Sequence, residues 1–302
     1  MEKKILITGG TGLIGKRLTQ MLLEKNYVVR YLSRRKRAIK DVEVFEWNPQ
    51  AGTIEKEAFE GVDTIIHLAG AGVADKRWTD SRKKEILKSR TQSTELLAST
   101  IQELGAAPKA VISASAVGYY GINTGDQLVD ESYSAGSDFL ADVTSAWEES
   151  AKAFVEAGIR TVKIRVGVVL SKESGALPKL LQPIRLGLGA PLGSGKQYLS
   201  WIHIDDIARI FLYALENTQL QGPYNGVAPH PVTNTQMTKM IASVIHRPAF
   251  LPNVPSFMLK MMLGEMASIV IDGNRVASDK ITESGFEFKF PELKQALENL
   301  LD

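Results

Sequence analysis

Short apolar runs alternate with longer amphipathic segments along the first half of the chain. The apolar runs predict strands over residues 4–8, 28–33, 64–68, 109–114 and 160–166. The segments between them repeat apolar residues at helical spacing, which predicts helices over residues 13–25, 79–104 and 138–157. This βαβα alternation predicts an α/β fold, with a doubly wound and mostly parallel sheet that helices cover on both faces.

The second half of the chain follows a different pattern. After a glycine-rich loop, helical spacing returns over residues 205–216 and 233–246. The last segment, from Pro255 to Leu301, is predicted to be helical with an interruption near Gly285 and Pro291.

A glycine-rich turn follows the first predicted strand and leads into the first predicted helix. Its sequence is Thr8-Gly9-Gly10-Thr11-Gly12-Leu13-Ile14-Gly15, and it contains the dinucleotide-binding fingerprint G-x-G-x-x-G. The glycines allow a tight turn and a close approach of a pyrophosphate, and the helix N-terminus offers unpaired N–H groups to phosphates. An ordinary glycine-rich turn is the alternative, but the position after an N-terminal strand favours the nucleotide. The predicted cofactor contacts in this turn are Gly9, Thr11, Gly12, Leu13 and Ile14.

This turn makes the predicted sheet a Rossmann-type sheet. We assign residues 1–170 to a Rossmann domain that binds a dinucleotide, to which residues 200–230 return. Residues 171–302 are predicted to form a smaller, mixed substrate lobe, including a C-terminal helical domain at about 250–300.

Several predicted strands end in small or polar residues. In an open α/β sheet the ligand crevice lies at the carboxyl ends of the strands. Leu68, Ala69 and Gly70 follow one strand, and Ser113 and Ser115 end the next. We therefore expect these residues to lie beside the glycine-rich turn in one site.

The end of the second strand indicates which nicotinamide cofactor binds. A Rossmann unit that binds NAD usually carries an acid there, for the ribose 2′-hydroxyl. Here the strand ends in Ser33-Arg34-Arg35, with no acid. A guanidinium pairs with a phosphate through two hydrogen bonds, so these residues favour NADP(H) over NAD, with Arg34 the stronger candidate. The alternative is a solvated basic loop, because further cations follow.

Composition excludes some functions. The chain has 302 residues, no cysteine and a net charge of +2, which rules out disulfides and thiolate chemistry and gives no indication of a nucleic-acid or membrane partner. The four histidines lack metal-ligand spacing, so no metal site is expected. No signal peptide or membrane span is evident, so the cytoplasm is the expected compartment.

The chain resembles an extended short-chain dehydrogenase/reductase of the nucleotide-sugar epimerase type. The motifs that carry this resemblance are Thr8–Gly15, Ser113–Gly121 and Trp201–Ala208. It is more similar to the atypical subgroup labelled "epimerase family protein", which ends in a small domain of unknown function. That similarity covers essentially the whole chain, including the segments Arg185–Gly189, Pro191–Gly195, Tyr224–Pro229, Leu263–Met266 and Asp272–Val276.

The resemblance implies NADP(H) binding and a set of contacts. It places Ser33 and Arg34 at the 2′-phosphate and the loop Leu68–Gly70 along the cofactor. It also implies that Glu85 and Arg90 face the cofactor, although charged residues on a helix usually face solvent. Val169 follows a strand at the expected position of the nicotinamide end.

The chain departs from this family in its catalytic residues. Active extended reductases carry Tyr-x-x-x-Lys on the helix after the serine strand, and here Phe139 and Val143 stand near the expected positions. A phenol with a pKa near 10 needs a neighbouring cation to act as a base near neutral pH, so the usual mechanism is missing. Ser115 and Tyr119 are the candidate catalytic residues. The alternatives are that Ser115 caps a turn and that Tyr119 packs as aromatic bulk.

Two functions follow from these observations. The first is an NADP(H)-dependent oxidoreductase or an epimerase-type isomerase that acts on a small carbonyl or nucleotide-sugar-like substrate. The alternative is an NADP(H)-binding sensor or regulatory protein without catalysis. The resemblance also implies a homodimer, since the extended family is often dimeric.

Overall fold

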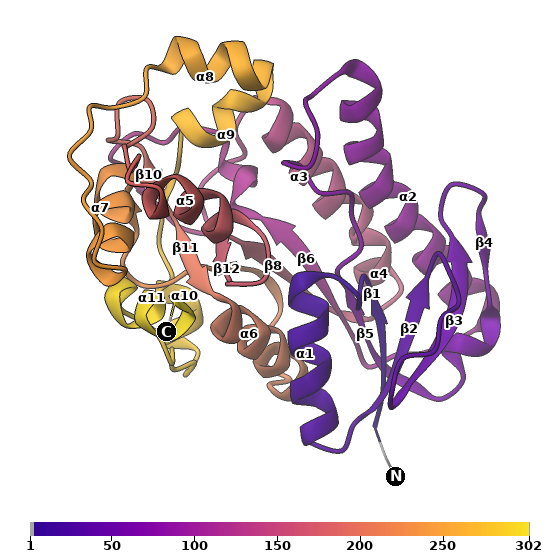
Figure 1. Ribbon diagram of the computed structural model, residues 1–302. Helices are drawn as coiled ribbons and strands as arrows, with labels where there is room; N and C mark the ends of the chain where they lie inside the picture. Colours follow the sequence, from indigo (N-terminus) through magenta and orange to yellow (C-terminus); the bar gives the residue numbers. More distant parts are fainter. Residues whose placement is uncertain (1–2, 302) are drawn as a thin grey trace.

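An eight-stranded sheet crosses the computed structural model, which describes residues 3–301 (Figure 1). Its strand order is β12-β8-β6-β5-β1-β2-β3-β4, and every neighbouring pair except β3–β4 is parallel. The doubly wound α/β prediction is therefore confirmed. The strands are β1 (Lys4–Thr8), β2 (Val28–Ser33), β3 (Val42–Asn48), β4 (Thr53–Ile54), β5 (Val62–His67), β6 (Ala110–Ala116), β8 (Arg160–Val166) and β12 (Gly222–Gly226).

Helices cover both faces of this sheet, with α1 and α6 on one face and α2, α3 and α4 on the other (Figure 1). The helices are α1 (Leu13–Glu24), α2 (Asp80–Leu104), α3 (Phe139–Ser150), α4 (Lys152–Glu156), α5 (Ala176–Arg185), α6 (Ile204–Glu216), α7 (Asn234–Val244), α8 (Ser256–Leu263), α9 (Ser268–Ile271), α10 (Asp279–Glu283) and α11 (Leu293–Leu301). Short strands form three further pairs: β7 (Leu128–Val129) with β14 (Arg275–Val276), β9 (Val168–Leu170) with β11 (Trp201–His203), and β10 (Tyr198–Leu199) with β13 (Val232–Thr233). No helix among residues 3–301 is long and apolar enough to cross a membrane.

The first strand shows why its sequence is apolar without interruption. Ile5 and Ile7 point into the core on the side of α1 and α6, whereas Leu6 points into the core on the side of α2. All three side chains are fully buried. Successive side chains of a strand point to opposite faces, so a strand covered on both sides buries every residue.

The C-terminal part shares its core with the sheet. Leu297 and Leu300 of α11 belong to the same apolar cluster as Ile207 of α6 and Ile5 of β1. The late strand β12 returns to the sheet edge beside β8. The segment 200–230 thus contributes one strand to the main sheet. The later helix α11 packs on the same core.

Several elements differ from the sequence-based expectations. The helix expected over residues 138–157 is divided into α3 and α4 at Ala151. The final segment forms short helices separated by the 3₁₀ turn Gly264–Ala267 and by β14, and Gly264 takes a positive φ of 64° that favours glycine. The strand β3, which lies between β2 and the edge strand β4, was not expected, because the adjacent apolar residues Val44 and Phe45 break its alternation.

Candidate cofactor and substrate site

The glycine-rich turn forms a cradle at the N-terminus of α1. Gly9 has a φ of 69°, and a Cβ added there would lie 2.8 Å from the Leu68 backbone. A Cβ on Gly15 would lie 2.5 Å from the Gly9 carbonyl oxygen, so both glycines are required by close packing. A Cβ on Gly12 would meet only the Gly9 carbonyl oxygen, at 3.2 Å. Gly12 is also the N-cap of α1 and provides no side-chain cap. The first N–H groups of α1 therefore face an open space that suits phosphate oxygens.

Thr8 holds the loop after β5 against this turn. Its Oγ1 accepts hydrogen bonds from the backbone N–H groups of Leu68 and Ala69, both at 3.2 Å. The same Oγ1 lies 2.7 Å from Nδ1 of His67, which is fully buried. Burial and the charge of Arg90 lower the pKa of His67 to about 3, so this ring stays neutral. The predicted residues Leu68, Ala69 and Gly70 are thus brought beside Gly9.

The end of β2 presents a hydroxyl and a free cation. Oγ of Ser33 accepts a 3.5 Å hydrogen bond from the backbone N–H of Arg35. Arg34 is exposed, and among residues 3–301 its side chain forms no hydrogen bond or ion pair. By contrast, Arg30, which lies earlier on β2, is buried and forms a 2.6 Å ion pair with Glu43. Ser33 and Arg34 are therefore available to an external phosphate.

Helix α2 places its two predicted residues differently. The Arg90 guanidinium donates to the carbonyl oxygens of Ala71 (3.0 Å) and Ile86 (2.9 Å) and lies close to Gly70, whose added Cβ would be 3.2 Å from Arg90 Cζ. Burial and the charge of Arg82 lower the pKa of Arg90 to about 10. No carboxylate pairs with Arg90 in the described part of the chain.

Glu85 lies one turn earlier and is exposed. It accepts a 2.7 Å hydrogen bond from Arg82, which lowers the pKa of the carboxyl group, with a smaller contribution from Arg34. Arg90 is therefore a cation at the edge of the cleft, whereas Glu85 belongs to an exposed ion pair within reach of the charge on Arg34.

A buried polar cluster stands where β6 and β8 end. Ser115 is 3% exposed, and its hydroxyl donates to Oε1 of Glu148 on α3 at 2.7 Å. Arg165 donates to both oxygens of Glu148, at 2.8 and 3.1 Å. Burial alone would raise the pKa of Glu148, but the hydrogen bonds and charge of Arg165 outweigh it and hold this pKa below its ordinary value. Glu148 is thus ionised, and it holds the hydroxyl proton of Ser115.

Two tyrosines surround this cluster in different ways. The Tyr119 ring lies against the guanidinium of Arg165, with 3.5 Å between Cζ and the ring centroid, and is half-buried. The hydroxyl of Tyr120 donates to Asn225 at 2.7 Å and accepts from Arg165 at 3.0 Å. Burial raises the pKa of Tyr120 to about 12. Tyr120 is therefore a structural phenol, and Tyr119 is the tyrosine with the freer side chain.

Helix α3 presents Leu140 and Thr144 to the turn that follows β6. A Cβ added to Gly118 in that turn would lie 3.3 Å from Leu140 and 3.5 Å from the Thr144 hydroxyl. Phe139 packs edge-on against Trp78 at 4.9 Å, and Val143 is buried. Leu140 and Thr144 therefore pack against the turn at Gly118, and neither carries a phenol or an ammonium group.

The remaining predicted residues frame the cleft. Ser113 is 1% exposed and its hydroxyl donates to the adjacent Ala114 carbonyl, which leaves it no proton for a ligand. Leu13 and Val169 approach one another at Gly175, whose added Cβ would lie 3.7 Å from Leu13 Cδ2 and 3.5 Å from the Val169 carbonyl oxygen. Thr11 and Ile14 are partly buried in the glycine-rich turn and the first turn of α1.

Sequence reasoning missed two features of this site. It did not identify Glu148 as the partner of Ser115, although an acid on the otherwise apolar face of α3 is an unusual signal. It also missed two contacts that join the C-terminal lobe to the loop after β5 and to α2. Arg77, in the loop after β5, donates to the Met261 carbonyl oxygen of α8 at 2.7 Å, and Lys83 of α2 forms an ion pair with Glu265. The C-terminal lobe is thereby held over the strand ends.

Two family models match the chain. The model of the NAD dependent epimerase/dehydratase family matches residues 5–227, and a domain of unknown function (DUF1731) matches residues 254–300. The chain is 39% identical to epimerase family protein YfhF of Bacillus subtilis, over 98% of this chain and 97% of that protein. It is also 39% identical to the chloroplastic epimerase family protein SDR39U1 homolog of Arabidopsis thaliana, over 99% of this chain and 87% of that protein.

Two solved structures of epimerase-type proteins are also similar to this chain. A crystal structure of human epimerase family protein SDR39U1 (isoform 2) with NADPH matches with a TM-score of 0.87 and 33% identity, over 98% of each chain. The nucleoside-diphosphate sugar epimerase from Corynebacterium glutamicum matches with a TM-score of 0.81 and 32% identity, over all of this chain and 58% of that one.

Proposed function

Because this chain belongs to the NAD dependent epimerase/dehydratase family, we propose that it binds NADP(H) and acts as an oxidoreductase or epimerase-type isomerase. The observation that carries the proposal is the cradle formed by Gly9, Gly12 and Gly15, whose α1 N–H groups are uncapped and whose Gly12 position is open. The crystal structure of the human relative with NADPH supports the choice of cofactor.

The residues of the cleft fit this cofactor. The N–H groups of α1 would bind the diphosphate, and Arg34 with Ser33 would bind the 2′-phosphate, because guanidinium and hydroxyl groups both donate to phosphate oxygens. Arg90 adds a positive charge beside Gly70 that no carboxylate in the described part of the chain neutralises. When bound, the nicotinamide supplies or accepts the hydride. Val169 and Ser115 are our candidates for its reacting end.

We propose a small carbonyl or nucleotide-sugar-like compound as substrate. The support is the name of the relative from Corynebacterium glutamicum, a nucleoside-diphosphate sugar epimerase at 32% identity. Tyr119 is the candidate proton donor, since its side chain is half-buried and its ring is held by Arg165. The homodimer implied by the sequence resemblance is part of the proposal, and light scattering of the purified chain tests it.

A second function is favoured by specific contacts. Helix α3 carries neither a tyrosine nor a lysine, and the Ser115 proton is held by Glu148. A protein that binds NADP(H) as a sensor, without turnover, requires neither group. The sensor and the enzyme would use the same cofactor site, and only the enzyme would carry out a reaction there.

Two measurements separate these functions. The first is a fluorescence titration of the purified chain with NADPH and with NADH. The second is absorbance at the reduced-nicotinamide band with a panel of carbonyl compounds and nucleotide sugars. Saturable NADPH binding with turnover of any compound supports the enzyme. Tight NADPH binding with no turnover supports the sensor, and absence of NADPH binding overturns both.

A further inference from the structure

Two adjoining cavities lie between α5, α11 and the first turns of α1 and α6. Their volumes are about 420 and 400 Å³, and Lys172 and Leu300 line both of them. Leu13, the first residue of α1 and a predicted cofactor contact, lines the second cavity, which therefore borders the proposed cofactor cradle. No other predicted cofactor contact and neither catalytic candidate lines either cavity.

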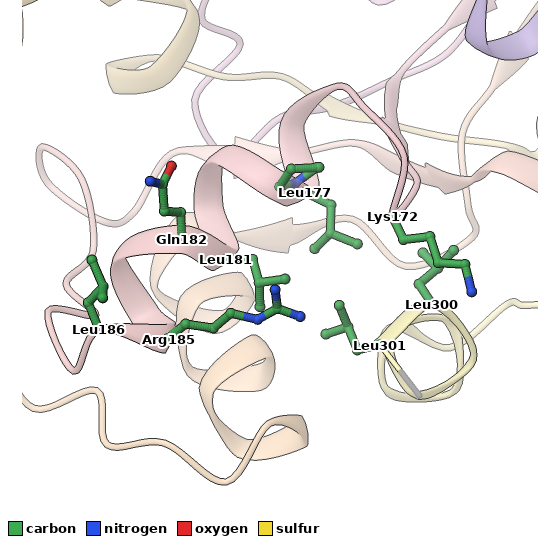
Figure 2. Close-up of a pocket in the computed structure, with 9 residues that line it drawn as sticks. Lys172, Leu177, Leu181, Gln182, Arg185, Leu186, Leu300 and Leu301 are labelled. Atoms are coloured by element: carbon green, nitrogen blue, oxygen red, sulfur yellow. The ribbon is translucent and has the colours of Figure 1, made fainter.

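The first cavity is an apolar channel. Leu177 and Leu181 of α5 face Leu300 and Leu301 of α11 across it (Figure 2). In the same view, the Arg185 side chain reaches from α5 toward Leu301, so its aliphatic stem borders the channel. Leucine walls of this kind take up an alkyl chain, because burial removes the chain from water.

The second cavity contains a buried polar atom without a partner. His203 is 1% exposed, and its Nδ1 accepts a 3.0 Å hydrogen bond from the backbone N–H of Asp205. Burial lowers the pKa of His203, so the ring is neutral and carries its proton on Nε2. This Nε2 forms no hydrogen bond with residues 3–301. The exposed side chain of Asn299 lies near the ring and interacts with it, which partly offsets the lowering of the His203 pKa.

The charges along the two cavities favour an anion. Arg17 and Asp205 neutralise one another in a 2.6 Å ion pair. Of the other charged residues that line the cavities, three are cations and one is an acid, and none of them forms an ion pair within residues 3–301: Lys16, Lys172, Arg185 and Glu173. An unpaired buried N–H and an excess of positive charge together attract a carboxylate.

We propose that the adjoining cavities bind a carboxylate that bears an unbranched alkyl chain. The carboxylate would lie between Lys172 and Nε2 of His203, and rotation of the exposed Asn299 amide would open the way to Nε2. The alkyl chain would run past Leu300 into the leucine channel between α5 and α11. This site borders the phosphate cradle at Leu13 and lies apart from the cluster around Ser115.

Calorimetric titration of the full chain with octanoate, decanoate, 1-decanol and acetate, all below micellar concentrations, tests the proposal. We expect one decanoate to bind per chain and acetate not to bind. Each CH₂ that enters the channel should tighten binding about fourfold. Decanol should bind about tenfold more weakly than decanoate, because it lacks the charge.

Two variants locate the carboxylate. Lys172→Gln should weaken decanoate binding about tenfold and leave decanol binding unchanged, whereas the matched control Lys40→Gln, at an exposed lysine outside the cavities, should change neither. His203→Asn keeps an oxygen to accept from the Asp205 N–H but removes the Nε2 proton, so it should weaken decanoate binding as well. Its thermal unfolding must be recorded, since the His203 ring stacks on Phe290 at 4.0 Å.

Three results would overturn the proposal. They are no saturable decanoate binding, equal affinities for decanoate and decanol, or unchanged decanoate binding in Lys172→Gln. Unchanged decanoate binding in Lys172→Gln would indicate that Lys172 interacts with the carbonyl groups at the C-terminus of α11 and not with the carboxylate. If His203→Asn fails to fold, the lysine variant and the chain-length series still decide the question.

Discussion

The hydroxyl of Ser115 donates its proton to the carboxylate of Glu148 at 2.7 Å, although the two residues are 33 positions apart in the sequence. Glu148 is itself held by two hydrogen bonds from Arg165. The serine at the end of β6 is thereby part of a buried ion-pair network, and a substrate carbonyl would compete with Glu148 for its proton. This competition affects whether Ser115 can donate its proton to a substrate in the cleft.

Removing the charge of Glu148 should be costly. Glu148→Gln leaves the guanidinium of Arg165, which is 3% exposed, without a carboxylate partner. Breaking a buried pair in this way typically costs about 3–5 kcal/mol. Urea denaturation should show this loss, whereas Glu149→Gln, at an exposed neighbour paired with Lys152, should change the free energy of unfolding by less than about 0.5 kcal/mol. Equal effects of the two variants would contradict the assigned pairing.

The same carboxylate predicts an acid-dependent stability. The pKa of Glu148 is lower in the folded chain than its ordinary value of 4.5, so the unfolded state takes up a proton first as the pH falls. The stabilisation from this group is therefore complete above about pH 4.5 and is lost as the pH drops through the folded-state pKa. Urea midpoints measured from pH 6 downward should fall less steeply in Glu148→Gln than in the unsubstituted chain. Parallel curves would contradict the prediction.

Ser115→Ala should lower the rate of any reaction without changing NADPH binding. The variant removes one donor from Glu148 but leaves both Arg165 hydrogen bonds, so it should cost about 1 kcal/mol of stability. NADPH affinity should stay the same, because the serine hydroxyl faces Glu148. For any compound that the chain converts, kcat should fall with little change in NADPH affinity, and Ser115→Thr should restore part of it. Unchanged kcat in the alanine variant would exclude Ser115 from the reaction.

Arg34→Ala should discriminate between the two nicotinamide cofactors. The guanidinium forms no ion pair within the described chain, so its loss should not destabilise the fold. Loss of a charge-assisted phosphate contact should weaken NADPH binding about 10- to 100-fold and leave NADH binding nearly unchanged. Arg35→Ala is the neighbouring control and should have a smaller effect. Equal weakening of both cofactors by Arg34→Ala would refute the 2′-phosphate contact.

Gly12 and Gly15 should respond differently to alanine. In Gly12→Ala the new methyl group meets only one oxygen at 3.2 Å, so the chain should fold with nearly the same melting temperature but bind NADPH at least about tenfold more weakly. In Gly15→Ala the methyl group would collide with the Gly9 backbone at 2.5 Å, so stability should drop first. Normal NADPH binding by Gly12→Ala would mean that the phosphates do not approach this turn.

The local features of the site were predictable from the sequence. The strands at residues 4–8 and 28–33 have the predicted bounds in the structure, and the helix expected at 13–25 ends one residue earlier. The strand β3 was not predictable from alternation, because the adjacent apolar residues Val44 and Phe45 break the pattern. Its position in the sheet is set by parallel pairing with β2, a tertiary contact that outweighs the local pattern.

The amino-acid sequence by itself determined the sheet class, the glycine cradle and the basic end of β2. These depend on the spacing of apolar residues and on glycines within one turn, which are properties of neighbouring positions. Only the tertiary structure decided that Glu148 faces Ser115, that Leu140 and Thr144 pack against the turn at Gly118, and that α11 closes a leucine channel against α5. These contacts join residues far apart in the chain, and the packing of helices on the sheet sets which side of each helix is buried.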